Sequence, residues 1–149
     1  MRFLLIHTSG ATSGAEGSVA LASDTGVVAL ETLPGRSASE RLVGAVRRLM
    51  DAAGWKLSDL TAVVVADGPG SFTGVRVGLS AAKGLCEAGG VPLIAVSRLA
   101  LVASAIANEG PVHAVLDAGR GEFYHGEYVG HRMVREALLT RAPIPESNI

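Results

Sequence analysis

The stretch that decides the fold of this chain runs from Asp67 to Leu85 and reads Asp-Gly-Pro-Gly-Ser-Phe-Thr-Gly-Val-Arg-Val-Gly-Leu-Ser-Ala-Ala-Lys-Gly-Leu. It follows an apolar run, Thr61 to Ala66, that is typical of a buried strand. The Gly68-Pro69-Gly70 triplet predicts a tight turn, because proline fixes φ and glycine permits positive φ. Ser71 or Thr73 then stands where a side chain caps the following helix. The stretch therefore predicts a strand, a tight turn and a helix.

This helix, from about Thr73 to Gly89, contains an unusual number of small residues. Each glycine costs roughly 1 kcal/mol in a helix interior, so something must pack very close to it. Apolar or small residues also cover more of its circumference than one packed sheet can bury. We expect a second surface against it, and close packing inside the monomer is the alternative. The candidate interface residues are Val43, Arg47 and Met50 from the preceding helix, and Gly74, Gly78, Ala81 and Leu85.

The first part of the chain predicts an antiparallel start followed by a helix. A strand at Leu4 to Ile6 precedes a hairpin made by Ser18 to Ser23 and Val27 to Leu33. The Ser37-Ala-Ser-Glu40 sequence predicts a capping box at the start of a helix that Gly54 ends.

The later part predicts further strands and a second domain. The expected elements are a strand at Pro92 to Val96, a helix at Leu99 to Asn108, a strand at Val112 to Leu116 and a hairpin joining Gly121 to Val129 with Arg132 to Leu138. The order predicts an α/β fold with a mixed sheet flanked by helices. We expect an N-terminal domain over residues 1–110, a partial second domain over 111–139 and a frayed tail over 140–149.

Composition limits the class of protein. The chain has 149 residues, 48% of them hydrophobic, and a single cysteine, Cys86, which favours a reducing compartment. No run reaches the ~20 apolar residues of a membrane span, and the N-terminus lacks the pattern of a signal peptide, so we expect a cytoplasmic protein. The net charge is −1 with basic residues spread along the chain. Any contact with nucleic acid should therefore depend on a partner.

No motif in the chain predicts catalysis. Val75-Arg76 follows Gly74 where a phosphate-binding Walker loop needs Lys-Ser/Thr, so a tight turn with close helix packing is the favoured interpretation of these glycines over phosphate binding. The four histidines, His7, His113, His125 and His131, lack metal-ligand spacing, and we expect His113 and His125 to be packing or surface residues. Cys86 lies on an apolar helix face, so we expect it to be a small buried hydrophobic residue and not a nucleophile. We predict no catalytic, cofactor-binding or metal-binding residues.

The Gly68-Pro-Gly-Ser-Phe-Thr-Gly-Val-Arg76 motif resembles that of the bacterial TsaB (YeaZ) family. Supporting segments are Ser18-Val-Ala-Leu21, the Ser37 to Leu42 helix entry, Val96-Ser97-x-Leu99 and Leu116-Asp-Ala-Gly-Arg-Gly-Glu-Phe-Tyr124. The chain departs from the family at His7, where members usually carry Asp. The resemblance implies an actin-like, ribonuclease-H-like (ASKHA) fold, here with a truncated second domain.

The resemblance also implies a function without catalysis by this chain alone. TsaB pairs with the catalytic subunit TsaD, joined by the ATPase TsaE, to make threonylcarbamoyladenosine in tRNA. We therefore expect a non-catalytic subunit that docks on TsaD, forms a homodimer when alone and meets tRNA only indirectly. The alternative is a small actin-like nucleotide-binding phosphotransferase using Asp117 and the Gly-rich loops. A neutral His7 cannot replace a carboxylate that holds hydrated Mg²⁺, which argues against that alternative.

Overall fold

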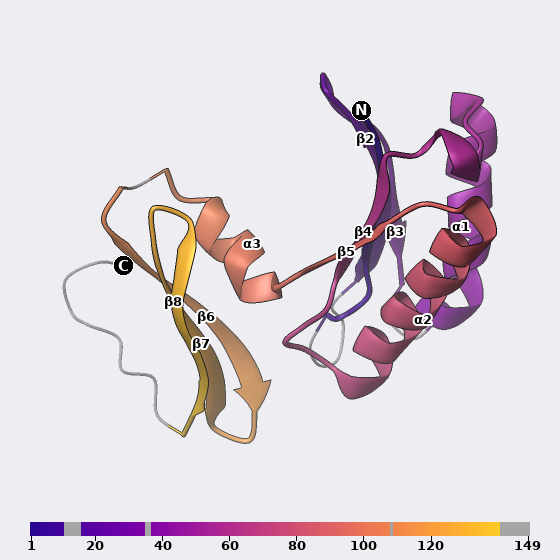
Figure 1. Ribbon diagram of the computed structural model, residues 1–149. Helices are drawn as coiled ribbons and strands as arrows, with labels where there is room; N and C mark the ends of the chain where they lie inside the picture. Colours follow the sequence, from indigo (N-terminus) through magenta and orange to yellow (C-terminus); the bar gives the residue numbers. More distant parts are fainter. Residues whose placement is uncertain (11–15, 35–36, 108, 141–149) are drawn as a thin grey trace. The chain divides into compact units, whose positions relative to one another are not determined.

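A computed structural model describes residues 1–10, 16–34, 37–107 and 109–140 (Figure 1). The chain forms two compact units, Met1–Val96 and Ser97–Ile149, and each is described by itself. The sequence predicts the domain boundary near residue 110, whereas the structure divides the chain at Val96. The difference concerns the helix α3 (Arg98–Ser104), which packs with the strands that follow it.

The first unit contains a five-stranded mixed sheet in the order β3-β2-β1-β4-β5. The strands are β1 (Arg2–His7), β2 (Gly17–Ser23), β3 (Gly26–Leu33), β4 (Ala62–Ala66) and β5 (Leu93–Val96). The first three pair antiparallel, and β4 joins β1 in parallel with Leu4 opposite Val63 and Ile6 opposite Val65. The predicted hairpin and the predicted strand before the Gly-rich turn are confirmed.

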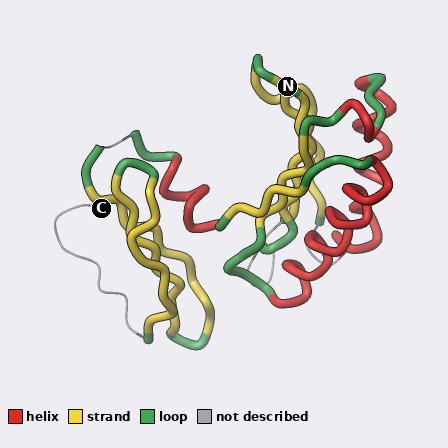
Figure 2. Tube along the Cα trace, in the orientation of Figure 1, coloured by secondary structure: helices red, strands yellow, loops and turns green. Residues whose placement is uncertain are grey.

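The helices α1 (Ala38–Ala53) and α2 (Phe72–Gly89) both pack on this sheet, as the red segments in Figure 2 show. Each ends at a glycine in the left-handed conformation, Gly54 or Gly90, whose N–H bonds back to the last turn. A short 3₁₀ helix, η2 (Leu57–Asp59), leads into β4. Ser71 caps α2 by accepting a hydrogen bond from Gly74 N at 3.0 Å, as its position predicts.

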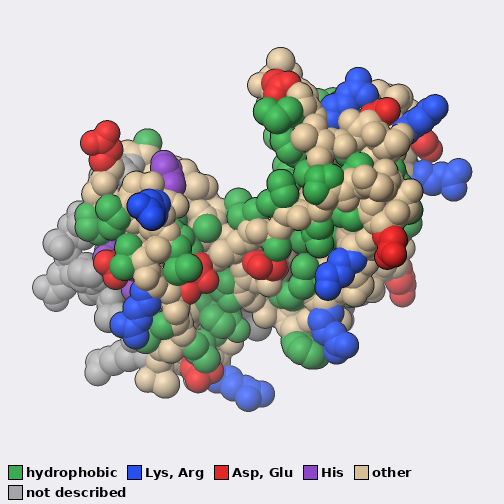
Figure 3. Space-filling view, viewed as in Figure 1, with side chains coloured by type: hydrophobic (Ala, Val, Ile, Leu, Met, Phe, Trp, Pro, Cys, Tyr) green, Lys and Arg blue, Asp and Glu red, His purple; other side chains and the backbone are tan. Residues whose placement is uncertain are grey.

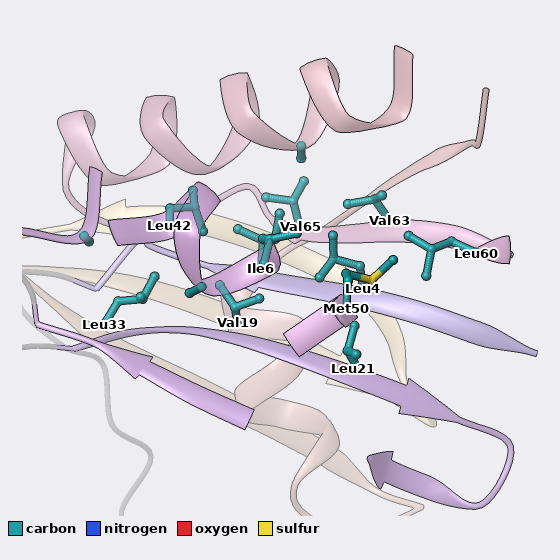
Figure 4. Packing of buried hydrophobic residues seen from close by; sticks show 14 residues of the cluster. Leu4, Ile6, Val19, Leu21, Leu33, Leu42, Met50, Leu60, Val63 and Val65 are labelled. Carbon is teal, nitrogen blue, oxygen red and sulfur yellow. The ribbon is translucent and has the colours of Figure 1, made fainter. Parts of the chain in front are cut away.

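The core of the first unit lies between the sheet and the two helices. Leu4, Ile6, Val63 and Val65 point from the strands toward the helices, where Leu42 of α1 meets them (Figure 4). The core side chains alternate along β1 and β4. On α1 they recur four residues apart, at Leu42, Val46 and Met50, so each of these elements contributes one apolar face.

The predicted capping box at α1 is wrong. The side chain of Ser37 makes no cap hydrogen bond, and its hydroxyl instead lies 3.5 Å from the carbonyl oxygen of Pro34. The backbone N–H of Ser37 bonds to the same oxygen at 3.0 Å, so the turn that enters the helix holds Ser37 toward Pro34.

The second unit is a three-stranded antiparallel sheet with one helix. Its strands β6 (Pro111–Gly119), β7 (Glu122–Val129) and β8 (Arg132–Leu139) lie in chain order. The helix α3 packs Leu99 and Ala103 onto Val112, Ala114 and Tyr128. The predicted β7–β8 hairpin is confirmed, while residues 141–149 of the predicted tail lie outside the described residues.

Candidate functional site

An apolar groove of about 310 Å³ lies between α1 and α2 in the first unit. Four of the seven predicted interface residues line it. The lining residues are Val43, Val46, Arg47, Met50 and Asp51 of α1, Trp55, Lys56 and Leu57 of the connection, and Leu85 of α2. Most of this surface is apolar with a few charged groups beside it, and an apolar centre with a polar rim is a common arrangement in protein interfaces.

The helix α1 presents one side of its surface to the groove. Val43, Arg47 and Met50 recur at intervals of four and three residues, so they follow one another along the same side of the helix. Val43 is 60% exposed, whereas Met50 is only 5% exposed and belongs to the core as well. Val43 is therefore exposed at the groove, while Met50 contributes to the buried floor of the groove.

Exposed charges accompany the apolar lining. Arg47 Nε lies 3.7 Å from Asp51 Oδ2, one helical turn further on, and both side chains are largely exposed. Such an exposed pair contributes at most about 1 kcal/mol to stability. A partner could therefore break it at little cost and contact both side chains.

The connection from α1 to β4 forms the other end of the groove. The left-handed turn at Gly54 brings Trp55 N within 2.9 Å of the carbonyl oxygen of Met50. The guanidinium of Arg2 stacks 4.9 Å from the centre of the Trp55 ring. A Cβ on Gly89 would come within 2.9 Å of Leu57 Cβ, so the glycine near the end of α2 lets this connection approach.

The remaining predicted interface residues, Gly74, Gly78 and Ala81, are not among the residues that line this groove. A Cβ on Gly74 would collide with the carbonyl oxygen of Thr8, and one on Gly78 would collide with the Thr8 hydroxyl. Ala81 is partly buried against the core cluster. The two glycines are therefore explained by close packing of α2 on the end of β1, which was the alternative to an interface.

The Gly68–Gly74 turn also packs against the segment after β1. A Cβ on Gly70 would overlap the carbonyl oxygen of Ser9, and Thr8 Oγ1 donates a hydrogen bond to Gly74 O at 2.7 Å. The N–H of Gly74 already bonds to Ser71 Oγ. These contacts agree with the interpretation of the glycines as a tight turn with close helix packing.

The residues considered for nucleotide chemistry are engaged locally. His7 Nδ1 lies 3.2 Å from Ser9 Oγ, and Asp117 Oδ1 accepts a hydrogen bond from Gly119 N at 2.7 Å. His7 belongs to the first unit and Asp117 to the second. The carboxylate of Asp117 therefore stabilises its own turn, a common role for Asp in loops.

Cys86 of α2 is partly buried against the core of the first unit. Burial raises the pKa of the Cys86 thiol, which disfavours the reactive thiolate. Within residues 1–10, 16–34, 37–107 and 109–140, no three His, Cys, Asp or Glu side chains are grouped to hold a metal ion. None of the described helices is long and apolar enough to cross a membrane.

One side-chain pair was missed by the sequence analysis. His113 and His125 form a hydrogen bond across β6 and β7, although we predicted separate packing or surface roles for them. Their positions in two neighbouring strand-like segments were a signal, but the register that brings them together depends on how the Gly119–Gly121 turn closes.

The chain is similar in sequence to proteins of one family. The family model "TsaD: tRNA N6-adenosine threonylcarbamoyltransferase" matches residues 21–142. The tRNA threonylcarbamoyladenosine biosynthesis protein TsaB of Escherichia coli is 38% identical over 148 residues, which cover 93% of this chain. The chain spans only 62% of the length of that relative.

Solved structures show a similarity to the same family. YeaZ from Pseudomonas aeruginosa is 33% identical with a TM-score of 0.77, and the match covers 97% of this chain and 70% of YeaZ. A candidate N-acetylglucosamine kinase from Porphyromonas gingivalis is 16% identical with a TM-score of 0.52, over 92% of this chain and 47% of the kinase; it supports the actin-like fold alone. The chain therefore belongs to the TsaB (YeaZ) family, within the wider group that the TsaD family model describes.

Proposed function

We propose that this chain is a non-catalytic partner subunit in the formation of threonylcarbamoyladenosine in tRNA, and that it docks on the catalytic TsaD subunit. The groove between α1 and α2 carries the proposal, because it joins Val43, Arg47, Met50 and Leu85 into one largely apolar surface. The name of the Escherichia coli relative, a threonylcarbamoyladenosine biosynthesis protein, supports a role in this pathway. The match to the TsaD family model supports kinship with the proposed partner.

The same surface could bind either TsaD or a second copy of this chain. Val43 and Arg47 are exposed, and a partner helix laid along α1 would cover both while resting on Met50. The same surface would join two copies of this chain when TsaD is absent, and TsaE would join the complex later. Both assemblies would occupy the groove, so they exclude each other.

The charge distribution favours indirect contact with tRNA. The chain has 13 lysines and arginines against 14 acidic residues. On the face of the first unit in Figure 3, basic and acidic side chains are interspersed. A protein that grips RNA by itself usually gathers its basic residues, so we assign most tRNA binding to the partner and place the complex in the cytoplasm.

Binding of purified TsaD, measured by calorimetry with the variant Val43→Asp, tests this proposal. We expect the aspartate to weaken binding by at least about tenfold, equivalent to roughly 1.4 kcal/mol, because a partner would strip water from its charge, and an exposed pairing with Arg47 one turn away offsets little of that cost. Val27→Asp is the matched control, since Val27 is a similarly exposed valine in β3, and it should bind normally. Equal affinities for the two variants, or no binding by the unmodified chain, would refute the proposed docking.

A further inference from the structure

Two histidines of the second unit share a hydrogen bond across β6 and β7. His113 Nδ1 lies 3.0 Å from His125 Nε2, and the ring centroids are 5.2 Å apart with an angle of 18° between the planes. In the strand register, His113 lies opposite Glu127, so His125 is the diagonal neighbour on the same face of the sheet. His125 is only 8% exposed, so solvent screens its charge weakly.

The chemistry of imidazole limits how many protons this pair can hold. A hydrogen bond between two ring nitrogens needs one N–H donor and one nitrogen with a free lone pair. A neutral pair and a singly charged pair both satisfy this requirement. When both rings are charged, both facing nitrogens carry hydrogen, and two like charges meet where the hydrogen bond was.

The charged groups around the pair come from all three strands. The alternation of side chains places Asp117 of β6, Glu127 of β7 and Arg135 of β8 on the same face as the two histidines. Burial is the main factor that lowers the pKa of His125, followed by His113, while Glu127 raises it and Arg135 lowers it. The helix α3 packs with Val112, Ala114 and Tyr128 instead, which belong to the other face.

We propose that His113 and His125 form a proton-operated clasp between β6 and β7, closed while the pair holds at most one proton and opened when both rings are charged. Because the folded-state pKa of His125 lies below its ordinary value of 6.5, the clasp stabilises the hairpin fully above pH 6.5. This stability is lost as the pH falls from 6.5 toward the lower folded-state pKa. The second unit should therefore loosen in mild acid at β6 and β7 first.

The histidine signals of the full chain, followed by NMR between about pH 8 and pH 4.5 with EDTA present, test this clasp. Amide protection factors of β6 and β7 are measured over the same range. In the unmodified chain, we expect His125 to titrate below 6.5 and the protection to fall as it does. His113→Gln keeps a hydrogen-bonding side chain but removes one charge, so the pKa of His125 should rise and the acid-induced loss of protection should shrink.

The control variant is His131→Asn. His131 lies in the β7–β8 turn with a φ of 64°, a conformation that asparagine tolerates, and this change should leave both readouts unchanged. An equal loss of protection in the unmodified chain and in His113→Gln would overturn the clasp. So would an unmodified His125 that titrates at or above 6.5, a result that needs no variant to fold.

Discussion

The hydroxyl of Thr8 occupies the position that a Cβ atom on Gly78 would need, because α2 lies directly on the end of β1 at this point. Thr8 is buried, and its Oγ1 donates a hydrogen bond to Gly74 O at 2.7 Å, one turn earlier in the helix. Threonine and glycine are thus matched across two elements that are far apart in the sequence.

Gly78→Ala should destabilise the fold, because its new methyl group would overlap the Thr8 hydroxyl. We expect a loss of about 1–3 kcal/mol in the free energy of unfolding, measured by urea denaturation. Gly84→Ala in the same helix is the control, since a Cβ there meets nothing within 4 Å. This control should gain up to about 1 kcal/mol from better helix propensity. A gain in both variants would contradict the packing described here.

The two serines that precede the long helices should differ in their effect on stability. Ser71→Ala removes a real helix cap and should cost about 0.5–2 kcal/mol. Ser37→Ala removes a side chain without a cap hydrogen bond, so it should change stability by less than about 0.5 kcal/mol. Thermal unfolding of the two variants side by side measures the difference, and equal losses would restore the capping box at α1.

Two residues that line the groove should differ in their effect on stability. Met50→Ala should lower the free energy of unfolding by about 2–5 kcal/mol, because Met50 is a buried core residue as well as the groove floor. Val43→Ala should leave stability within about 0.5 kcal/mol, since the side chain is mostly exposed. Denaturant midpoints check both values. A large loss at Val43 would mean that the residue supports the fold and is not free for a partner.

Tyr128 should make the second unit sensitive to alkali. Burial, helped by a hydrogen bond to the carboxylate of Glu136, raises the pKa of Tyr128 from about 10 to about 12. The folded state therefore holds this proton more tightly than the unfolded state, and the resulting stability is complete below pH 10 and is lost between pH 10 and 12.

Tyr128→Phe should remove this loss, and unfolding of the second unit measured on both sides of pH 10 checks it. Tyr124→Phe is the control and should keep the loss. Absorbance at 295 nm adds an independent reading, because a tyrosine that ionises only near pH 12 should be missing from Tyr128→Phe.

Local patterns in the sequence predict much of this fold. The period of the apolar residues predicts the strands around Asp24-Thr25-Gly26 and the core side of α1, and the Gly68-Pro69-Gly70 turn predicts where α2 begins. Each of these signals depends on residues near one another in the chain, which is why they can be read without the tertiary structure. The sequence analysis expected Val43, Arg47 and Met50 beside the small-residue helix as interface residues; they line the groove, and their role in an interface stays a prediction.

Features that depend on contacts between distant segments could not be predicted. The small residues of α2 suit a partner and a neighbouring strand equally well, and only the position of Thr8 shows that β1 fills the space at Gly78. The place of α3 depends on Gly126, where a Cβ would crowd Leu99 and Tyr128. The pairing of His113 with His125 depends on strand register in the same way.

The contact between Thr8 and Gly74 has a consequence for how the first unit folds. The two residues are separated by 66 positions, and β1 also needs β4 as its parallel neighbour. During synthesis, β1 leaves the ribosome long before the segment that completes its surroundings, so it must wait unpaired on that side. Closing so long a loop is entropically expensive before any native contact repays it. We therefore expect the folding rate of this unit to be limited by the arrival of β4 and α2, and not by formation of the β2–β3 hairpin.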